Sequence, residues 1–222
     1  MSFSFHKYEG EQMSLTTPVS RLVLADLIGR SSIRARALTV DAGLVIAGVA
    51  LVALLAKVSF FIGPVPITGQ TLGVIAVGAA LGSRRGAAAL TTYMLAGLAG
   101  MPVFAGAIAG PAYVLSPSFG FVVGFIPAAF VAGWFAERAW DRKPWLAFFG
   151  FAAASTVPFL IGIPYMSLIL ATVSGQQVTV GSVLEMGLWP FIAPGLIKAG
   201  AAALVIPGAW LLVRAVDRSK RH

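Results

Sequence analysis

The chain has 222 residues, of which 58% are hydrophobic and only 11% are charged, and its mean hydropathy is +0.89. Soluble domains usually carry about 25% charged residues, so this composition excludes an ordinary soluble domain and predicts one polytopic membrane domain. The absence of cysteine excludes disulfides and cysteine-ligated metal sites.

Apolar segments follow one another along the whole chain after residue 40. We predict helices near residues 42–62, 67–83, 86–104, 118–136, 145–173 and 184–213. A helix needs about 20 apolar residues to cross a bilayer. By that measure the second segment is short, whereas the fifth and sixth are long enough to tilt or break. The predicted fold class is all-α, a polytopic membrane protein with six transmembrane helices.

The basic residues indicate how these helices are oriented. The net charge is +8, and all of the Lys and Arg residues except Lys57 and Lys198 fall into four groups that six spans place on one side of the membrane. These groups are Lys7, Arg21, Arg30, Arg34 and Arg36; Arg84 and Arg85; Arg138, Arg142 and Lys143; and Arg214, Arg218, Lys220 and Arg221. Because short basic loops stay in the cytoplasm, we expect both termini to be cytoplasmic in a multi-pass protein of the cell membrane (plasma or inner).

Three regions are predicted: a cytoplasmic N-terminal tail at 1–40, a six-helix transmembrane domain at 41–216 and a basic C-terminal tail at 217–222. The basic charge favours contact with anionic lipid headgroups. A nucleic-acid role is not expected, because basic residues interleaved with exposed aromatic residues are missing. Within the first tail, the stretch "PVSRLVLADLIGR" spaces Leu22, Val23, Leu27 and Ile28 between charges. This spacing suits either a short helix on the membrane interface or a disordered tail.

The stretch "FIGPVPITGQTLGV" is the first polar interruption. Pro64 and Pro66 disfavour helix, so the stretch is expected to be a stiff, extended external loop. Irregular backbone at membrane depth survives only where protein or a water-filled cavity satisfies it. Thr68 and Gln70 then lie at the start of the next helix, where they either cap that helix or contact a ligand.

A second interruption, "YMLAGLAGMPVFAGAIAG", is rich in glycine, which permits tight turns and close approach of a ligand to the backbone. Tyr93 and Phe104 offer ring faces there, although Tyr93 could instead bond to a neighbouring helix. The stretch "LSPSFGFVVGF" begins the fourth span with a proline turn. All three interruptions approach the external half of the membrane, so they could line one cavity.

Lys198 lies well inside the sixth predicted span, where a charged lysine costs several kcal/mol. Such residues usually face the bundle interior and have partners, so Lys198 is predicted to be functional; the alternative is that it snorkels or contacts carbonyls freed by Pro190 and Pro194. Lys57 lies near the external end of the first helix and can snorkel to water.

Small residues at helical spacing mark the first helix, at Gly43, Ala47 and Ala50. Such residues let helix backbones approach closely. They predict either packing within this chain or a docking face for another membrane subunit.

The motifs "PVPITGQTLGV", "GAALGSRRGA", "GMPVFAG", "SPSFGFVVGF", "IGIPYMSLIL" and "PFIAPGLIKA" follow one another over residues 42–210 with an order and spacing that resemble the BioY family. That family comprises the biotin-binding membrane subunits (S components) of energy-coupling-factor (ECF) transporters. The resemblance implies a six-helix bundle with a substrate cavity open to the outside, beneath the loop between the first two helices. It implies docking on a transmembrane coupling subunit driven by two ATPase subunits, which use the ATP, so that no cofactor is expected in this chain. A stand-alone biotin transporter and an S component for another vitamin are the alternatives.

The resemblance also implies a set of functional residues. The substrate-binding set is Thr68, Gln70, Tyr93, Phe104, Tyr165, Phe191 and Lys198, and the docking set is Gly43, Ala47 and Ala50. Lys198 would serve the polar or anionic end of biotin, the tyrosines and Phe104 the apolar walls, and Thr68 with Gln70 the closing loop. The family commonly has aspartate three positions before this lysine, where this chain has Gly195. Lys198 therefore either pairs directly with an anionic ligand or binds as a neutral amine.

An enzyme and a passive channel are the competing function classes. No catalytic or metal site is expected, because His6 and His222 lie at the two termini and no acidic pair lies within the spans. A serine nucleophile would have only Lys198 as its base, without a recognisable Ser–Lys signature. A channel would line a continuous polar path, whereas here the polar groups gather in the external half.

Overall fold

The computed structural model describes residues 22–27 and 34–219. Its main helices are α1 (Arg34–Lys57), α2 (Gln70–Leu81), α3 (Ser83–Leu98), α4 (Phe119–Glu137), α5 (Pro144–Thr172), α6 (Val180–Gly187) and α7 (Trp189–Ser219). Short 3-10 turns lie at η2 (Leu24–Leu27), η3 (Pro111–Leu115) and η4 (Trp140–Arg142), and strands β1 (Ser59–Phe60) and β2 (Ile67–Thr68) pair as one antiparallel hairpin. The described chain is thus almost entirely helical, as predicted.

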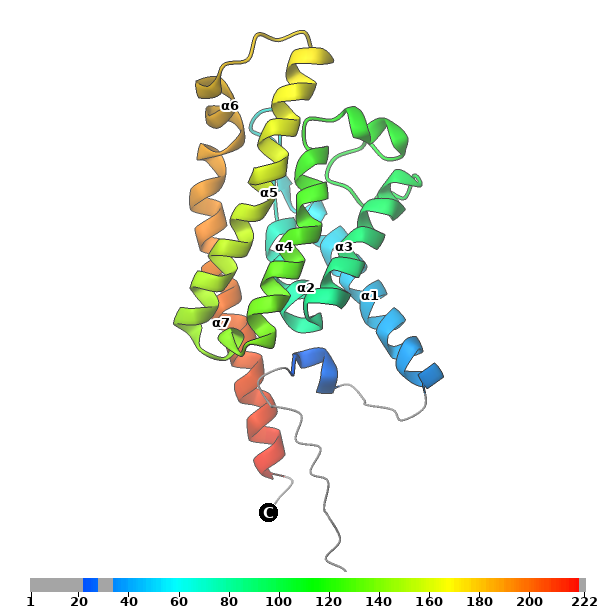
Figure 1. The fold of residues 1–222 in the computed structure, drawn as a ribbon, viewed down its shortest axis with the longest axis vertical. Helices are drawn as coiled ribbons and strands as arrows, with labels where there is room; N and C mark the ends of the chain where they lie inside the picture. The colour runs from blue at the N-terminus through cyan, green and yellow to red at the C-terminus, as the bar shows by residue number, and fades with distance from the viewer. Residues whose placement is uncertain (1–21, 28–33, 220–222) are drawn as a thin grey trace, which may run out of the picture.

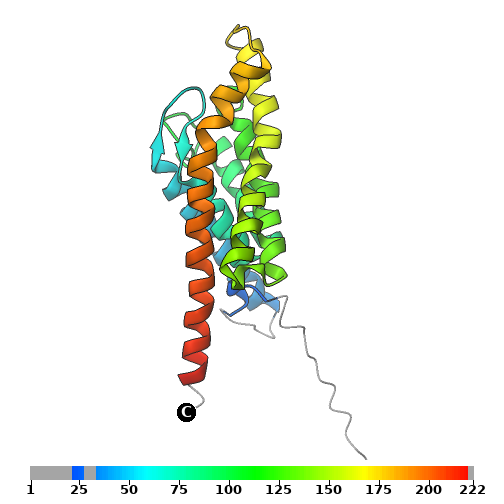
Figure 2. The same ribbon diagram turned by 90° about the vertical axis from the view of Figure 1, so that its left-hand side faces the viewer.

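The helices run roughly along one axis (Figures 1 and 2). The α2–α3 turn, the α4–α5 connection and the C-terminal part of α7 lie at one end, which we call the basic end because it carries Arg84, Arg85, Arg138, Arg142 and Lys143. The β1–β2 hairpin and the connections α3–α4 and α5–α6 lie at the opposite, hairpin end.

Four helical segments within the described residues are long and apolar enough to cross a membrane. They are Leu38–Lys57, Phe119–Glu137, Pro144–Thr172 and Val180–Leu212. Helices α2 and α3 have 12 and 16 residues. At about 1.5 Å per residue they measure about 18 and 24 Å, less than the roughly 30 Å hydrocarbon core. All six predicted helical segments therefore exist as helices, but only four of them reach spanning length.

Several predicted helix boundaries are wrong, each for a local reason. The first helix starts at Arg34 and stops at Lys57 rather than at 62, because Ser59–Phe60 turns away to pair with Ile67–Thr68. The same pairing delays the second helix from 67 to Gln70. The third helix ends at Leu98 rather than at 104. Just after this end, Gly100 takes a φ of +99°, which glycine adopts freely and which does not continue a helix.

The last predicted helix, 184–213, is in fact two helices separated at Leu188. Pro190 lacks a backbone N–H and occupies the first turn of α7, a position that proline tolerates, whereas it disfavours a helix interior. Helix α6 starts earlier than predicted, at Val180, because Thr179 and Ser182 form a reciprocal capping box at its N-terminus.

Helix α4 lies at the centre of the bundle and contacts α2, α3 and α5. Glycine permits the closest of these contacts: a Cβ on Gly78 would lie 2.3 Å from the carbonyl oxygen of Ala129, and one on Gly133 would lie 2.3 Å from the backbone nitrogen of Ser83. Helix α1 packs on α2 and α3 at the side of the bundle and leaves much of its surface exposed.

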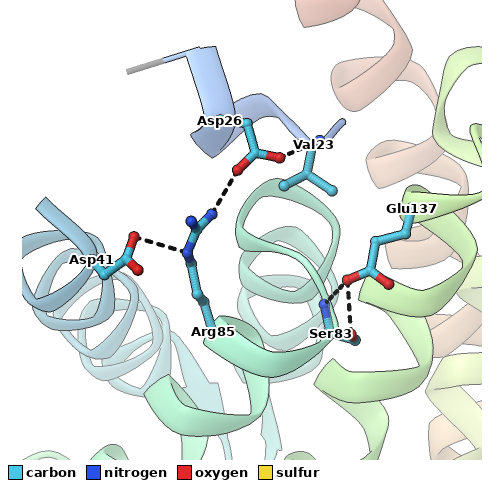
Figure 3. Close-up of polar contacts among 6 residues, drawn as sticks. All are labelled: Val23, Asp26, Asp41, Ser83, Arg85 and Glu137. Carbon is cyan, nitrogen blue, oxygen red and sulfur yellow. Dashed lines mark hydrogen bonds and ion pairs between the residues drawn. The ribbon is translucent and has the colours of Figure 1, made fainter. Parts of the chain in front are cut away.

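Residues 22–27 pack across the basic end, where Val23 and Ala25 are only 3% and 6% exposed. Asp26 accepts a hydrogen bond from the Val23 N–H at 3.1 Å and pairs with Arg85 at 2.9 Å, and Arg85 also reaches Asp41 of α1 at 2.9 Å (Figure 3). Arg85 of α3 therefore joins both this segment and α1 to α3. Residues 1–21, 28–33 and 220–222, which include most of the predicted tails and Ile28 of the predicted interfacial helix, lie outside the described residues.

Candidate functional site

A small cavity of about 50 Å³ lies at the junction of the β1–β2 hairpin with α2, α4, α5 and α7. Four of the predicted binding residues line it: Thr68, Gln70, Phe191 and Lys198. This volume holds a few water molecules, whereas pockets that bury a small ligand usually measure about 300–1,000 Å³. A vitamin-sized ligand would require the walls to move apart.

Lys198 extends from α7 toward the hairpin, and its Nζ donates a hydrogen bond to the backbone oxygen of Thr68 at 2.6 Å. Sequence reasoning offered the carbonyls near Pro190 and Pro194 as alternative partners, but the acceptor is on β2 instead. No carboxylate among the described residues forms an ion pair with Lys198. A Cβ built on Gly195, one turn earlier, would meet no atom within 4 Å.

A buried hydrogen-bond network fixes the hairpin next to the cavity. The Thr68 hydroxyl donates to Oε1 of Gln70 at 2.9 Å and accepts from the Gln70 backbone N–H at 3.2 Å. The Gln70 amide then donates to the Tyr93 hydroxyl at 2.7 Å, and that hydroxyl donates to the Val103 carbonyl at 2.9 Å. The N-cap of α2 is Gly69 rather than Thr68, although the Thr68 hydroxyl accepts from the first N–H of the helix and the Thr68 carbonyl accepts from Lys198. Contact of Thr68 with a ligand stays a prediction.

Three of the four predicted aromatic residues, Tyr93, Phe104 and Tyr165, form a row rather than the cavity wall itself. Tyr93 packs edge-on against Phe104, which stacks on Tyr113 with centroids 4.1 Å apart. Of these three, only Tyr113 lines the cavity. Tyr165 lies further along the row, its hydroxyl donating to the Val114 carbonyl, and it does not line the cavity. The binding roles of Tyr93, Phe104 and Tyr165 remain predictions; any such role would be indirect in this conformation.

The sequence analysis predicted that the stretch 115–125 could line a cavity, but it did not name the residues that do so. Ser118, Phe121 and Phe125 lie there on one face of α4 and its N-terminus. Their spacing, i, i+3 and i+7, places them on one side of a helix and could have identified them. Tyr113 in η3 donates to or accepts from Ser118 at 3.1 Å. Burial raises the pKa of Tyr113, with the Ser118 hydrogen bond opposing that rise, so the hydroxyl stays neutral.

Three phenylalanines from three helices close one side of the cavity. Phe121 of α4 lies 5.6 Å from Phe159 of α5 and 6.3 Å from Phe191 of α7, and the last two are 5.9 Å apart, all measured between ring centroids. Together with Lys198 and the polar groups of the hairpin, they make an apolar cavity with a few convergent polar groups. Such a site suits a small ligand with one anionic end and an apolar body.

The predicted docking residues Gly43, Ala47 and Ala50 are all exposed on α1. A Cβ on Gly43 would meet no atom within 4 Å. These three residues therefore do not pack within the described chain, and their face of α1 is open to another membrane protein or to lipid. Among the described residues, no group of three or more His, Asp or Glu side chains could hold a metal ion.

Comparison with known proteins identifies the family. The sequence model described as the BioY family matches residues 28–215. The biotin transporter BioY of Rhizobium etli is 39% identical over 159 residues, which are 68% of this chain and 81% of that protein. The probable biotin transporter BioY of Pyrococcus horikoshii is 32% identical over 165 residues, 74% of this chain and 93% of that protein.

A solved structure shares the fold. It is the crystal structure of the S-component for biotin from an ECF-type ABC transporter, which superimposes with a TM-score of 0.58 at 23% identity and covers 79% of this chain and 91% of that one. The fold and the extent of the sequence matches agree, and the chain belongs to the BioY family.

Proposed function

We propose that this protein is the substrate-binding membrane subunit of a vitamin importer, which binds biotin from the outside and delivers it inward with an energy-coupling module. The observation that carries the proposal is Lys198, an amine without a described carboxylate partner beside a small, largely apolar cavity. The relatives named as biotin transporters and the neighbour described as an S-component for biotin support it.

Biotin fits the chemistry of the cavity. Its carboxylate would pair with Lys198, its thiophane and chain would contact Phe121, Phe159 and Phe191, and its planar ureido group would take hydrogen bonds from Gln70 or Ser118. In that arrangement the carboxylate exchanges places with the Thr68 carbonyl as the partner of the ammonium. The hairpin is then released from α7, which would provide the widening that a ligand of this size needs.

The membrane arrangement is part of the proposal. All six helical segments would cross the membrane of the cell, with both termini in the cytoplasm; α2 and α3 would do so as short helices with the adjoining loops. Because the chain contains no cysteine, single cysteines report topology cleanly. A membrane-impermeant maleimide added outside intact cells should label Gln177→Cys and leave Arg84→Cys unlabelled; the reverse pattern would refute this orientation.

The proposed partners of the exposed α1 face are the subunits of the ECF module. Gly43, Ala47 and Ala50 would let a helix of the coupling subunit approach the α1 backbone closely. ATP would be hydrolysed by the ATPase subunits, so this chain would need no cofactor, and it would contact membrane lipid over its remaining apolar surface.

Equilibrium binding of labelled biotin to the detergent-purified chain tests the proposal. We expect saturable binding that unlabelled biotin displaces and that thiamine and riboflavin do not. Absence of biotin binding, together with a different vitamin identified by mass spectrometry of the purified protein, would overturn the choice of substrate. Biotin flux into vesicles that hold only this chain, without ATP, would instead indicate a stand-alone transporter.

A further inference from the structure

A second and larger hollow adjoins the candidate site. It is a groove of about 600 Å³ between α5 and α7. Four residues line both the groove and the small cavity: Thr71, Phe159, Phe191 and Lys198. The two spaces are therefore neighbours separated by the two phenylalanine rings, and Lys198 lies at their junction.

The groove owes its depth to small side chains. Ala152 and Ala153 of α5 and Gly195 of α7 line it, and a Cβ on Gly195 would meet nothing within 4 Å. Along α5 the lining runs from Phe149 to Ile163, which at about 1.5 Å per residue is a length of about 20 Å. A narrow apolar chain can therefore lie between the two helices over a considerable distance.

The chemistry of the groove changes along its course. Lys198 is its one charged lining residue, and Thr71, Ser155 and Thr156 are its hydroxyl-bearing ones. The remainder of the lining is apolar, and Leu160 and Leu196 on it are 74% and 50% exposed. A ligand that crosses from the cavity into the groove would pass Lys198 and then meet only apolar or weakly polar surface.

We infer that the protein accepts derivatives of biotin in which the carboxyl group carries an apolar tail through an amide bond, with the tail lying in the α5–α7 groove. This inference rests on the proposed function, because it places the bicyclic head in the cavity and the former carboxyl group at Lys198. The amide carbonyl accepts a hydrogen bond from Lys198 but carries no charge, so these amides bind less tightly than free biotin, and Phe159 and Phe191 turn aside to let the tail pass. The substrate class is therefore wider than free biotin and extends to its N-alkyl amides.

The test is displacement of labelled biotin from the purified full-length chain by unlabelled biotin, biotin N-methylamide and biotin N-octylamide. In the unaltered protein the octylamide should displace biotin at least as well as the methylamide. Ala153→Phe, which fills the groove from α5, should weaken the octylamide at least tenfold and change biotin and the methylamide by less than about twofold. Gly195→Leu fills the groove from α7 and serves as the second variant. Ile197→Phe, on the same helix but outside the groove lining, is the matched control.

The outcomes separate this inference from the proposed function. If biotin itself fails to bind, the proposed function fails. If biotin and the methylamide bind but the octylamide does not, the groove belongs to lipid or detergent and the inference is overturned. It is also overturned if Ala153→Phe and Gly195→Leu weaken the octylamide no more than Ile197→Phe does. The octylamide is compared across variants in one detergent, so its partition into micelles cancels there; in the comparison with the methylamide, displacement is calculated from the free octylamide concentration measured by dialysis.

Discussion

The Nζ of Lys198 lies 2.6 Å from the backbone carbonyl oxygen of Thr68, although the two residues are 130 positions apart in the chain. This hydrogen bond joins α7 to the end of the β1–β2 hairpin, and both residues line the small cavity. The amine therefore has a neutral acceptor where an anionic ligand would offer a stronger one, since hydrogen bonds between charged groups are roughly twice as strong as neutral ones. Under the proposed function, ligand binding and release of the hairpin would therefore involve the same amine, that of Lys198.

Replacement of Lys198 by Met should weaken biotin binding strongly. The substitution keeps an unbranched chain of similar length and removes the charge. Hydrogen bonds to charged groups contribute about 1.5–3 kcal/mol, which corresponds to a loss of affinity of roughly 10- to 150-fold. Equilibrium binding of labelled biotin to the purified variant measures this loss of affinity.

Lys57→Met is the matched control for that experiment. Lys57 also donates to a backbone carbonyl, that of Phe104 at 3.0 Å, but it lies at the exposed end of α1 and does not line the cavity. Its replacement should change affinity by less than about twofold, well below one hydrogen bond to a charged group. Equal affinities of the two variants for biotin would refute the role assigned to Lys198.

The hydrogen-bond network behind the hairpin predicts a difference between two tyrosines. Tyr93→Phe removes the hydroxyl that both accepts from Gln70 and donates to Val103 in a fully buried position. An unsatisfied buried polar group costs about 1–3 kcal/mol, so the free energy of unfolding should fall by that amount and the midpoint of thermal unfolding by several degrees. Tyr165→Phe, which removes a hydroxyl at a half-buried position, should have a smaller effect. A larger effect at Tyr165 would contradict the buried network as the main support of the hairpin.

The polar residues of the candidate site can be predicted from the sequence, whereas its apolar lining residues cannot. Lys198, Thr68 and Gln70 stand out because polar side chains are rare in an apolar chain and must be satisfied at membrane depth. Phe121 and Phe159 do not, because in a membrane protein an apolar side chain is equally suited to a cavity and to lipid. Only the packing of α4 against α5, which brings these rings within 5.6 Å of each other, distinguishes them.

The fold, likewise, can be predicted from the sequence only in part. Hydrophobic segments located the helices, but their ends depend on contacts that no local pattern contains. Residue 62 looks as apolar as the helix before it, and only the pairing of Ser59–Phe60 with Ile67–Thr68 ends α1 at Lys57. The break at Leu188 could have been predicted from the sequence, because Pro190 can occupy only the first turn of a helix without loss of a backbone hydrogen bond.

Glycines with different surroundings should respond differently to substitution. Gly78→Ala places a Cβ 2.3 Å from the Ala129 carbonyl oxygen, which forces α2 and α4 apart. Overpacking of this kind costs about 1–3 kcal/mol or more, so the variant should unfold at a clearly lower temperature or fail to purify as a single species. Gly43→Ala adds its Cβ to open space and should leave the unfolding temperature unchanged. Equal thermal stability of both variants would contradict the packing of α2 on α4.

Gly43→Leu tests the proposed docking face on α1 separately. The exposed position lets the larger side chain point outward, so biotin binding by the isolated chain should stay within about twofold, because a surface substitution rarely costs more than about 0.5 kcal/mol. Co-purification with a coupling module should fall markedly, since leucine keeps a partner helix from the α1 backbone. Normal assembly of the Gly43→Leu variant with the module would mean that the docking face lies elsewhere. Leu204→Ala, on the exposed surface of α7, is the control for a general effect of surface substitution on assembly.

Arg85 should control how firmly residues 22–27 are held at the basic end. Its pairs with Asp26 and Asp41 involve side chains that are 20–41% exposed, so each contributes only about 0.2–1 kcal/mol. Arg85→Ala should therefore make the segment open a few-fold to about tenfold more often.

In an Ala25→Cys background, otherwise free of cysteine, the rate of maleimide labelling at this 6%-exposed position measures the opening. Arg84→Ala removes the exposed neighbouring charge and should leave the rate unchanged. Because salt screens exposed charges, 1 M NaCl should narrow the difference in labelling rate between the unaltered arginine and Arg85→Ala. Equal labelling rates of the two proteins at low salt would mean that the apolar packing of Val23 and Ala25, rather than the ion pairs, holds the segment.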